Sequence, residues 1–231
     1  MPKALRYSAA DFIYGDNMKL LATLLSTAAL AVVCNAHAEG GRKEATLDLG
    51  KGAFKITVSV PDFADGPYDF AKNPDPKVNL QRDFSGGEIM YNAAIGESGV
   101  VVYQSNATHS RTVKTEQQKV TAEILAQAMI DQAGFKGRAQ QIPCPPAPIE
   151  GAKTACYKMS GAAIFNGKQR KDRIASVVVA VSFANDTMGY TLSGKIFEDN
   201  VAKFNADLQK YEKMALNAAG DIWQHSKLQL N

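Results

Sequence analysis

Residues 172–196 read DRIASVVVAVSFANDTMGYTLSGKI, and this stretch decides the fold. Residues 172–183 contain three consecutive valines and other β-branched side chains, which is typical of a buried strand. The pair Asn185-Asp186 predicts a turn because both side chains tolerate turn conformations. Residues 188–196 then predict a second strand, which would run back antiparallel to the first.

A third strand is predicted immediately before these two. Residues 156–165 have the strand pattern, and Asn166-Gly167 after them is a strong hairpin signal. Consecutive strands joined by short turns form an antiparallel meander rather than a parallel sheet. The second half of the chain therefore predicts a three-stranded meander.

The remainder of the chain predicts further strands and two helices. Apolar residues recur at helical spacing over residues 116–133 and again from residue 199 to residue 218. We expect Gly220 to end the second helix. An apolar tail containing Trp223 and Leu228 follows, and we expect it to pack back on the body. We predict a single α+β domain over residues 39–231, an antiparallel β-sheet flanked by helices. The other predicted strands span residues 45–49, 54–60, 88–95 and 99–104.

This order of elements resembles the MOG1/PsbP-like sandwich. The resemblance rests on the strand and proline stop of residues 54–62, FKITVSVPD, and on YTLSG at residues 190–194. It also rests on the closing helix with Phe204, Leu208 and Tyr211. The resemblance implies an antiparallel sheet flanked by helices and a role as an adaptor or assembly factor. It supplies no catalytic residues.

Residues 18–38 have the three parts of a secretory signal peptide. Lys19 precedes the apolar run of residues 20–33, and the small-residue site Ala36-His37-Ala38 follows. The run is shorter than the roughly 20 apolar residues of a membrane span. We therefore predict cleavage before Glu39, a periplasmic or secreted protein, and no membrane anchor after cleavage.

The residues around this leader raise two further points. Asp11 and Asp16 are unusual in a basic leader, so we expect residues 1–17 to be a translation-start artefact and Met18 to be the true start. Cys34 follows Val33 rather than a small residue, which disfavours lipidation.

Two cysteines remain after cleavage, Cys144 and Cys156. An even pair in an exported protein favours a disulfide. The enclosed residues 145–155 contain three prolines, which predicts a stiff surface loop. A redox pair is the alternative, but it usually needs a Cys-x-x-Cys motif. Neither His109 nor His225 lies at ligand spacing from a cysteine, so we predict no metal site.

Composition excludes several function classes. The chain has 231 residues, with 26 Lys and Arg against 23 Asp and Glu. A charge so near balance disfavours nucleic acid and anionic membranes as partners. The sequence has no phosphate-binding glycine loop, nucleophile elbow or zinc-binding helix motif. We therefore predict no cofactor.

Two basic clusters are candidate sites. His109 and Arg111 lie in a predicted polar loop over residues 106–115, where they could bind a small anion or where His109 could act as a general base. No carboxylate is placed to orient the imidazole, which favours a plain loop. The charged hairpin that carries Lys168, Arg170 and Arg173 could contact an anion or an acidic partner, but a solvated turn is favoured.

Two long loops are the surfaces that most need an explanation. Residues 61–83 contain four prolines, and loops of this length inside a compact domain are often functional. We expect Phe63, Tyr68 and Phe70 to anchor this loop in the core. The other surface is the 145–155 loop between the cysteines.

The sequence as a whole predicts a non-enzymatic binding or envelope accessory module whose partner is a protein of the envelope. The alternative is a small-molecule-binding protein or a hydrolase that uses the His109 loop. A pocket beside His109 with a carboxylate in reach would favour that alternative. Trp223 and Tyr211 could line a groove, although aromatic residues at such spacing usually belong to the core.

Overall fold

The computed structural model describes residues 41–49, 53–69, 84–110, 119–132, 135–136, 139–165 and 168–230. All of these residues belong to one compact unit. The predicted signal peptide, Arg111 and residues 70–83 lie outside the described residues. No helix among the described residues is long and apolar enough to cross a membrane.

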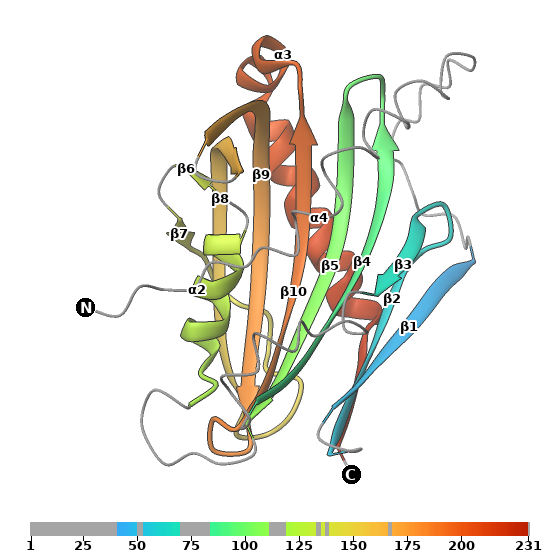
Figure 1. Cartoon of the computed structure of the whole chain (residues 1–231), viewed down its shortest axis with the longest axis vertical. Coiled ribbons are helices and arrows are strands. Elements are labelled where there is room, and N and C mark those ends of the chain that lie inside the picture. The colour runs from blue at the N-terminus through green and yellow to red at the C-terminus, as the bar shows by residue number, and fades with distance from the viewer. Residues whose placement is uncertain are drawn as a thin grey trace. The chain divides into compact units, whose positions relative to one another are not determined.

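The larger of two antiparallel sheets contains the predicted meander (Figure 1). Its strand order is β3-β4-β5-β10-β9-β8-β6, and β7 also pairs with β8. The meander β8-β9-β10 is confirmed, so the α+β class holds, whereas the finer resemblance to the MOG1/PsbP-like sandwich remains a prediction. The strands are β3 (Asp65–Asp69), β4 (Phe84–Ile95), β5 (Gly99–Ser110), β6 (Phe135–Lys136), β7 (Gln140–Gln141), β8 (Lys153–Phe165), β9 (Lys168–Phe183) and β10 (Met188–Glu198).

The smaller sheet joins the two ends of the described chain. It has the order β1-β2-β11, with β1 (Arg42–Leu49), β2 (Phe54–Pro61) and β11 (Lys227–Leu230). Leu228 pairs with Ile56, which confirms that the apolar tail packs back on the body.

Helix α2 (Ala122–Gln132) is shorter than the predicted helix over residues 116–133. Residues 119–121 are described and are not helical. The Thr121 hydroxyl accepts a hydrogen bond from an amide of the first turn (3.2 Å), and the Val120 amide donates to the Asp186 carbonyl (2.6 Å). The chain before Ala122 is thus tied to the β9–β10 turn, and the helix begins at a threonine cap.

The predicted C-terminal helix is two helices, α3 (Val201–Ala206) and α4 (Leu208–His225). They meet at Asp207, whose backbone (φ −117°, ψ 30°) is not helical. The expected stop at Gly220 was wrong, because Gly220 lies inside α4. Interior glycine costs a helix about 0.5–1 kcal/mol, and burial of Ile222 in the next turn offsets that cost.

Helices α2 and α4 cover opposite faces of the large sheet (Figure 1). Alternate residues of β9 accordingly belong to two cores. Val177 and Val181 belong to the main core with α4 and the small sheet. Val178 and Ala180 belong to a smaller core under α2.

Two glycines of β10 allow the helices to approach. A Cβ on Gly194 would lie 2.5 Å from the Ala215 carbonyl oxygen and 2.5 Å from the Ala219 amide nitrogen, both in α4. A Cβ on Gly189 would lie 2.5 Å from Leu125 of α2. One glycine therefore lets each helix pack closely on its own face of β10.

Candidate functional site

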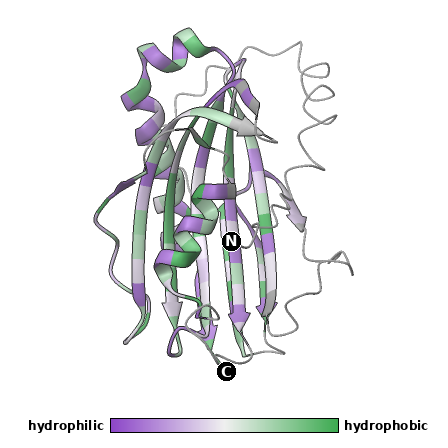
Figure 2. Ribbon diagram, turned by 60° about the vertical axis from the view of Figure 1, so that its left-hand side comes forward, coloured by the Kyte–Doolittle hydropathy of each residue, from purple (hydrophilic) through white to green (hydrophobic). Residues whose placement is uncertain are grey.

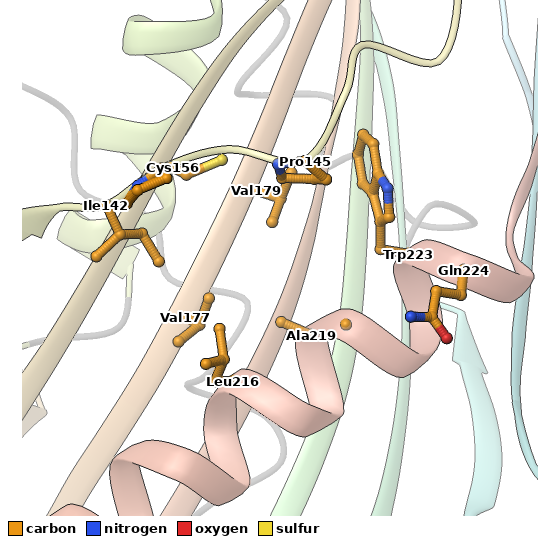
Figure 3. A pocket seen from close by; sticks show the side chains of 11 residues that line it. Ile142, Pro145, Cys156, Val177, Val179, Leu216, Ala219, Trp223 and Gln224 are labelled. Atoms are coloured by element: carbon orange, nitrogen blue, oxygen red, sulfur yellow. The ribbon is translucent and has the colours of Figure 1, made fainter.

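A groove of about 200 Å³ opens between α4, β9 and the segment that follows β7 (Figure 3). Its lining is apolar, and Gln224 supplies the one side chain in it with a polar head group. We call it the α4 groove. The lining residues are Ile142, Pro143, Pro145, Cys156, Val177, Val179, Leu216, Ala219, Gly220, Trp223 and Gln224.

The disulfide forms one wall of the α4 groove. Cys144 is bonded to Cys156 with a Cα–Cα distance of 5.4 Å, which confirms the predicted pair. The Ile142 amide also donates to the Cys156 carbonyl (3.0 Å). The proline-rich segment is therefore held against β8. The predicted 145–155 loop is shorter than expected, because β8 already begins at Lys153.

Helix α4 forms the opposite wall with three of its successive turns. Leu216, Gly220 and Trp223 follow the helical repeat and line the groove together. Leu216 is 50 % exposed and Trp223 is partly buried. A Cβ on Gly220 would meet no atom within 4 Å, so space is left open along this side of the helix.

A polar cluster lies next to one end of the α4 groove. Lys158 Nζ is 3.3 Å from Glu212 Oε2, and the Ser160 hydroxyl donates to Glu212 Oε1 (2.7 Å). Glu212 lies one helical turn before Leu216, and Lys158 lies two residues after Cys156 in β8. The cluster joins α4 to β8 and gives the apolar lining a charged rim.

Size and chemistry limit what the α4 groove can do. Drug-sized ligands usually occupy about 300–1,000 Å³, whereas an apolar cavity of about 150 Å³ suffices for benzene. A groove of about 200 Å³ thus fits one aliphatic or aromatic group. The described lining residues carry no titratable side chain, and the sulfur of Cys156 is held in the disulfide.

Of the predicted His109 site, the structure describes His109, whereas Arg111 lies outside the described residues. His109 lies in β5, where it pairs with Met188 and Ser85, so the predicted loop over residues 106–115 was wrong for residues 106–110. After the turn that follows β9, β10 lies beside β5, and the pairing of these two strands continues as far as His109. The buried His109 Nδ1 has no hydrogen-bond partner among the described residues, and His109 does not line the α4 groove.

The basic residues of the predicted charged hairpin lie in its second strand. Lys168, Arg170 and Arg173 belong to β9 rather than to a turn, because β8 and β9 pair as far as Phe165 and Lys168. The Arg173 guanidinium donates to the Lys171 carbonyl (3.4 Å). These basic residues are not part of the α4 groove.

The long loop departs from expectation, whereas one of the two aromatic candidates, Tyr211, belongs to the core as expected. Part of the 61–83 segment forms β3, and Phe63, expected as a core anchor, is 59 % exposed. Tyr68 is exposed as well. Tyr211 is core, and its hydroxyl donates to buried Glu198 (2.6 Å). Trp223 packs against the main core and also lines the groove, so both interpretations of this residue hold in part.

No protein-family model and no curated protein sequence matches the chain. Among solved structures, the chain is similar to LpqN of Mycobacterium tuberculosis, which is described as involved in cell envelope biogenesis. The TM-score is 0.37 and the identity is 14 %, over 82 % of this chain and 92 % of that chain. A similarity at this level carries no functional argument, and the function must be inferred from the α4 groove itself.

Proposed function

We propose that the protein is an exported, non-enzymatic binding module that accepts one apolar side chain of an envelope protein in the α4 groove. The apolar lining of this groove is the observation that carries the proposal. A disulfide persists in oxidising compartments, which supports export together with the signal peptide predicted at residues 18–38.

The anatomy of the groove supports a protein partner. Strong protein–protein contacts place an aliphatic or aromatic anchor in a pocket with a polar rim. The α4 groove has the volume for one such anchor, and Lys158 and Glu212 lie at its rim. Half-exposed Leu216 extends the apolar contact beyond the cavity. A whole small molecule would remain mostly outside a cavity of about 200 Å³.

The single tryptophan of the chain makes the proposal directly testable. We expect N-acetyl-leucinamide and N-acetyl-phenylalaninamide to shift the emission of Trp223 on titration, and N-acetyl-serinamide to leave it unchanged. Leu216→Lys should remove the response because it places a charge at the mouth of the groove. Leu208→Lys is the matched control, since Leu208 is 38 % exposed on the same helix and does not line the groove.

Three outcomes would contradict the proposal. The first is the absence of any response to the apolar amides, and the second is an equal response in Leu216→Lys and the wild type. The third is much tighter binding of dodecanoate than of either amide, which would assign the groove to a lipid chain instead. At the level of the partner, capture from envelope extract should be lost in Leu216→Lys and retained in Leu208→Lys.

A further inference from the structure

The face of the large sheet that α2 covers in part carries a row of buried polar residues. Lys195 on β10 is 5 % exposed, and Gln104 on β5 and Ser176 on β9 are also buried. Ser176 pairs with Lys195, and Gln104 pairs with Ser193. Directly paired residues point to the same face of a sheet, with Cβ atoms about 4.5–5.5 Å apart. We call these residues, together with Glu88, the Lys195 row.

A chain of hydrogen bonds crosses the Lys195 row. Lys195 Nζ donates to Gln104 Oε1, and Gln104 Nε2 donates to Glu88 Oε1. Burial lowers the pKa of Lys195 to about 8, although the charge of Glu88 acts in the opposite direction. Burial raises the pKa of Glu88, although the charge of Lys195 and the hydrogen bond from Gln104 act in the opposite direction.

The Lys195 row contains polar groups whose hydrogen bonding the described residues do not satisfy. The hydroxyls of Ser176 and Ser193 are buried and have no hydrogen-bond partner among the described residues. Gln104 takes one of the three N–H groups of Lys195. Buried polar atoms are nearly always paired in folded proteins, and a buried hydroxyl without a partner is destabilising. The described residues therefore leave these two hydroxyls without a hydrogen-bond partner.

We propose that Lys195, Ser176 and Ser193 form a binding site for a small oxyanion, the carboxylate or phosphate group of a ligand. Such a group presents two to four acceptor oxygens to the unmatched donors, and its charge pairs with the ammonium. A neutral polyol would leave that charge unpaired, and a cation would face Lys195. Glu88 is partly exposed and lies where the row reaches solvent.

Helix α2 limits how far the proposed site can extend along the sheet. The Asn106 amide nitrogen lies 2.7 Å from Met129 Sδ, so α2 covers the adjacent positions of β5. Asn106 pairs with Thr191, which lies two residues from Ser193 along β10 and on the same face of the sheet. The site thus lies beside α2 and on the face opposite to the α4 groove, and it does not depend on the function proposed for that groove.

The test is calorimetric titration of the purified protein at pH 7 with sodium phosphate and, separately, with sodium acetate. We expect millimolar or tighter binding of at least one probe. Lys195→Met should weaken that binding by about tenfold or more, because a charge-assisted hydrogen bond is lost. Ser176→Ala and Ser193→Ala should each weaken it by about threefold. Ser105→Ala is the matched control, since Ser105 is an equally buried hydroxyl without a partner on the opposite face.

The two probes separate the possible sources of the ligand. Binding of phosphate alone assigns the site to a phosphate group, and binding of acetate alone assigns it to a carboxylate. If Lys195→Met fails to fold by circular dichroism, the Ser176→Ala/Ser193→Ala double variant replaces it, with an expected loss of about tenfold. The proposal is overturned if neither probe binds, or if the Ser105→Ala control loses as much affinity as Ser193→Ala.

Discussion

The two faces of the large sheet differ in what they bury. The face toward α4 is apolar along β10, where Tyr190, Leu192 and Ile196 belong to the main core. On the other face the same strand buries Thr191, Ser193 and Lys195. Figure 2 shows hydrophilic and hydrophobic residues interspersed along the strands in this way. One strand thus contributes apolar side chains to the main core on one side and polar side chains to the Lys195 row on the other, since its side chains alternate between faces.

The comparison separates two kinds of recognition. The α4 groove has shape and apolar surface but no charge in its lining, so it can select a group by size. The Lys195 row has charge and unmatched hydroxyls, so it can select a ligand by its acceptors. Each of the following variants changes one face of the sheet, and the expected effects decrease in the order given.

The largest effect is expected from the helix contacts. Gly194→Val places its side chain against the backbone of α4, and we expect a loss of about 4 kcal/mol or more in the free energy of unfolding. Urea denaturation measures it, and groove binding should be lost. Gly189→Val should displace α2 instead and leave the α4 groove able to bind. Equal loss of groove binding in both variants would contradict the separation of the two faces.

The disulfide should rank second. We expect the Cys144→Ala/Cys156→Ala variant to lose about 3 kcal/mol of unfolding free energy in the chain-entropy model, as measured in urea. The proline segment is then held mainly by the Ile142 amide, so Trp223 should respond less to apolar amides. Oxyanion binding at the Lys195 row should persist. Loss of both activities together would indicate global unfolding rather than loosening of one wall.

The pH dependence of stability should report on the Lys195 row. The pKa of Lys195 falls from 10.5 to about 8 on folding, so the unfolded chain binds more protons between these values. The free energy of unfolding should therefore rise with pH across that window, by at most about 1.4 kcal/mol per pH unit. Urea melts at a series of pH values should show this rise in the wild type and a flatter profile in Lys195→Met. Glu88, with its raised pKa, acts in the opposite sense and in a separate window above 4.5.

The smallest effect is expected at the mouth of the groove. Leu216 is half exposed, so Leu216→Lys should change the unfolding free energy by less than about 0.5 kcal/mol. Its effect on apolar binding should nevertheless be large. Thermal denaturation of this variant beside Leu208→Lys checks the first statement. A marked destabilisation in Leu216→Lys alone would show that the residue supports α4 rather than a ligand.

Much of the fold could be predicted because its signals are local. The valine run of β9 and the Asn185-Asp186 turn indicate the meander from neighbouring residues alone. The helix boundaries could not be predicted in this way. Gly220 in the sequence indicates the end of a helix, and only the burial of Ile222 explains why α4 continues beyond it. The loop expected around His109 became strand because pairing with β10 extends β5, which depends on a partner distant in sequence.

The candidate site was predicted only in part, through Cys144, Cys156 and Trp223. By itself the sequence determined the meander and the pairing of the cysteines, since these follow from strand-forming runs separated by short turn signals and from an even cysteine count. Tertiary structure alone decided that Leu216 meets Val177 across a groove and that Lys195 meets Ser176. Such contacts depend on register and on how closely a helix can approach a sheet. Gly194 allows α4 to approach the sheet closely, and neither the composition nor the periodicity of the sequence reveals this role.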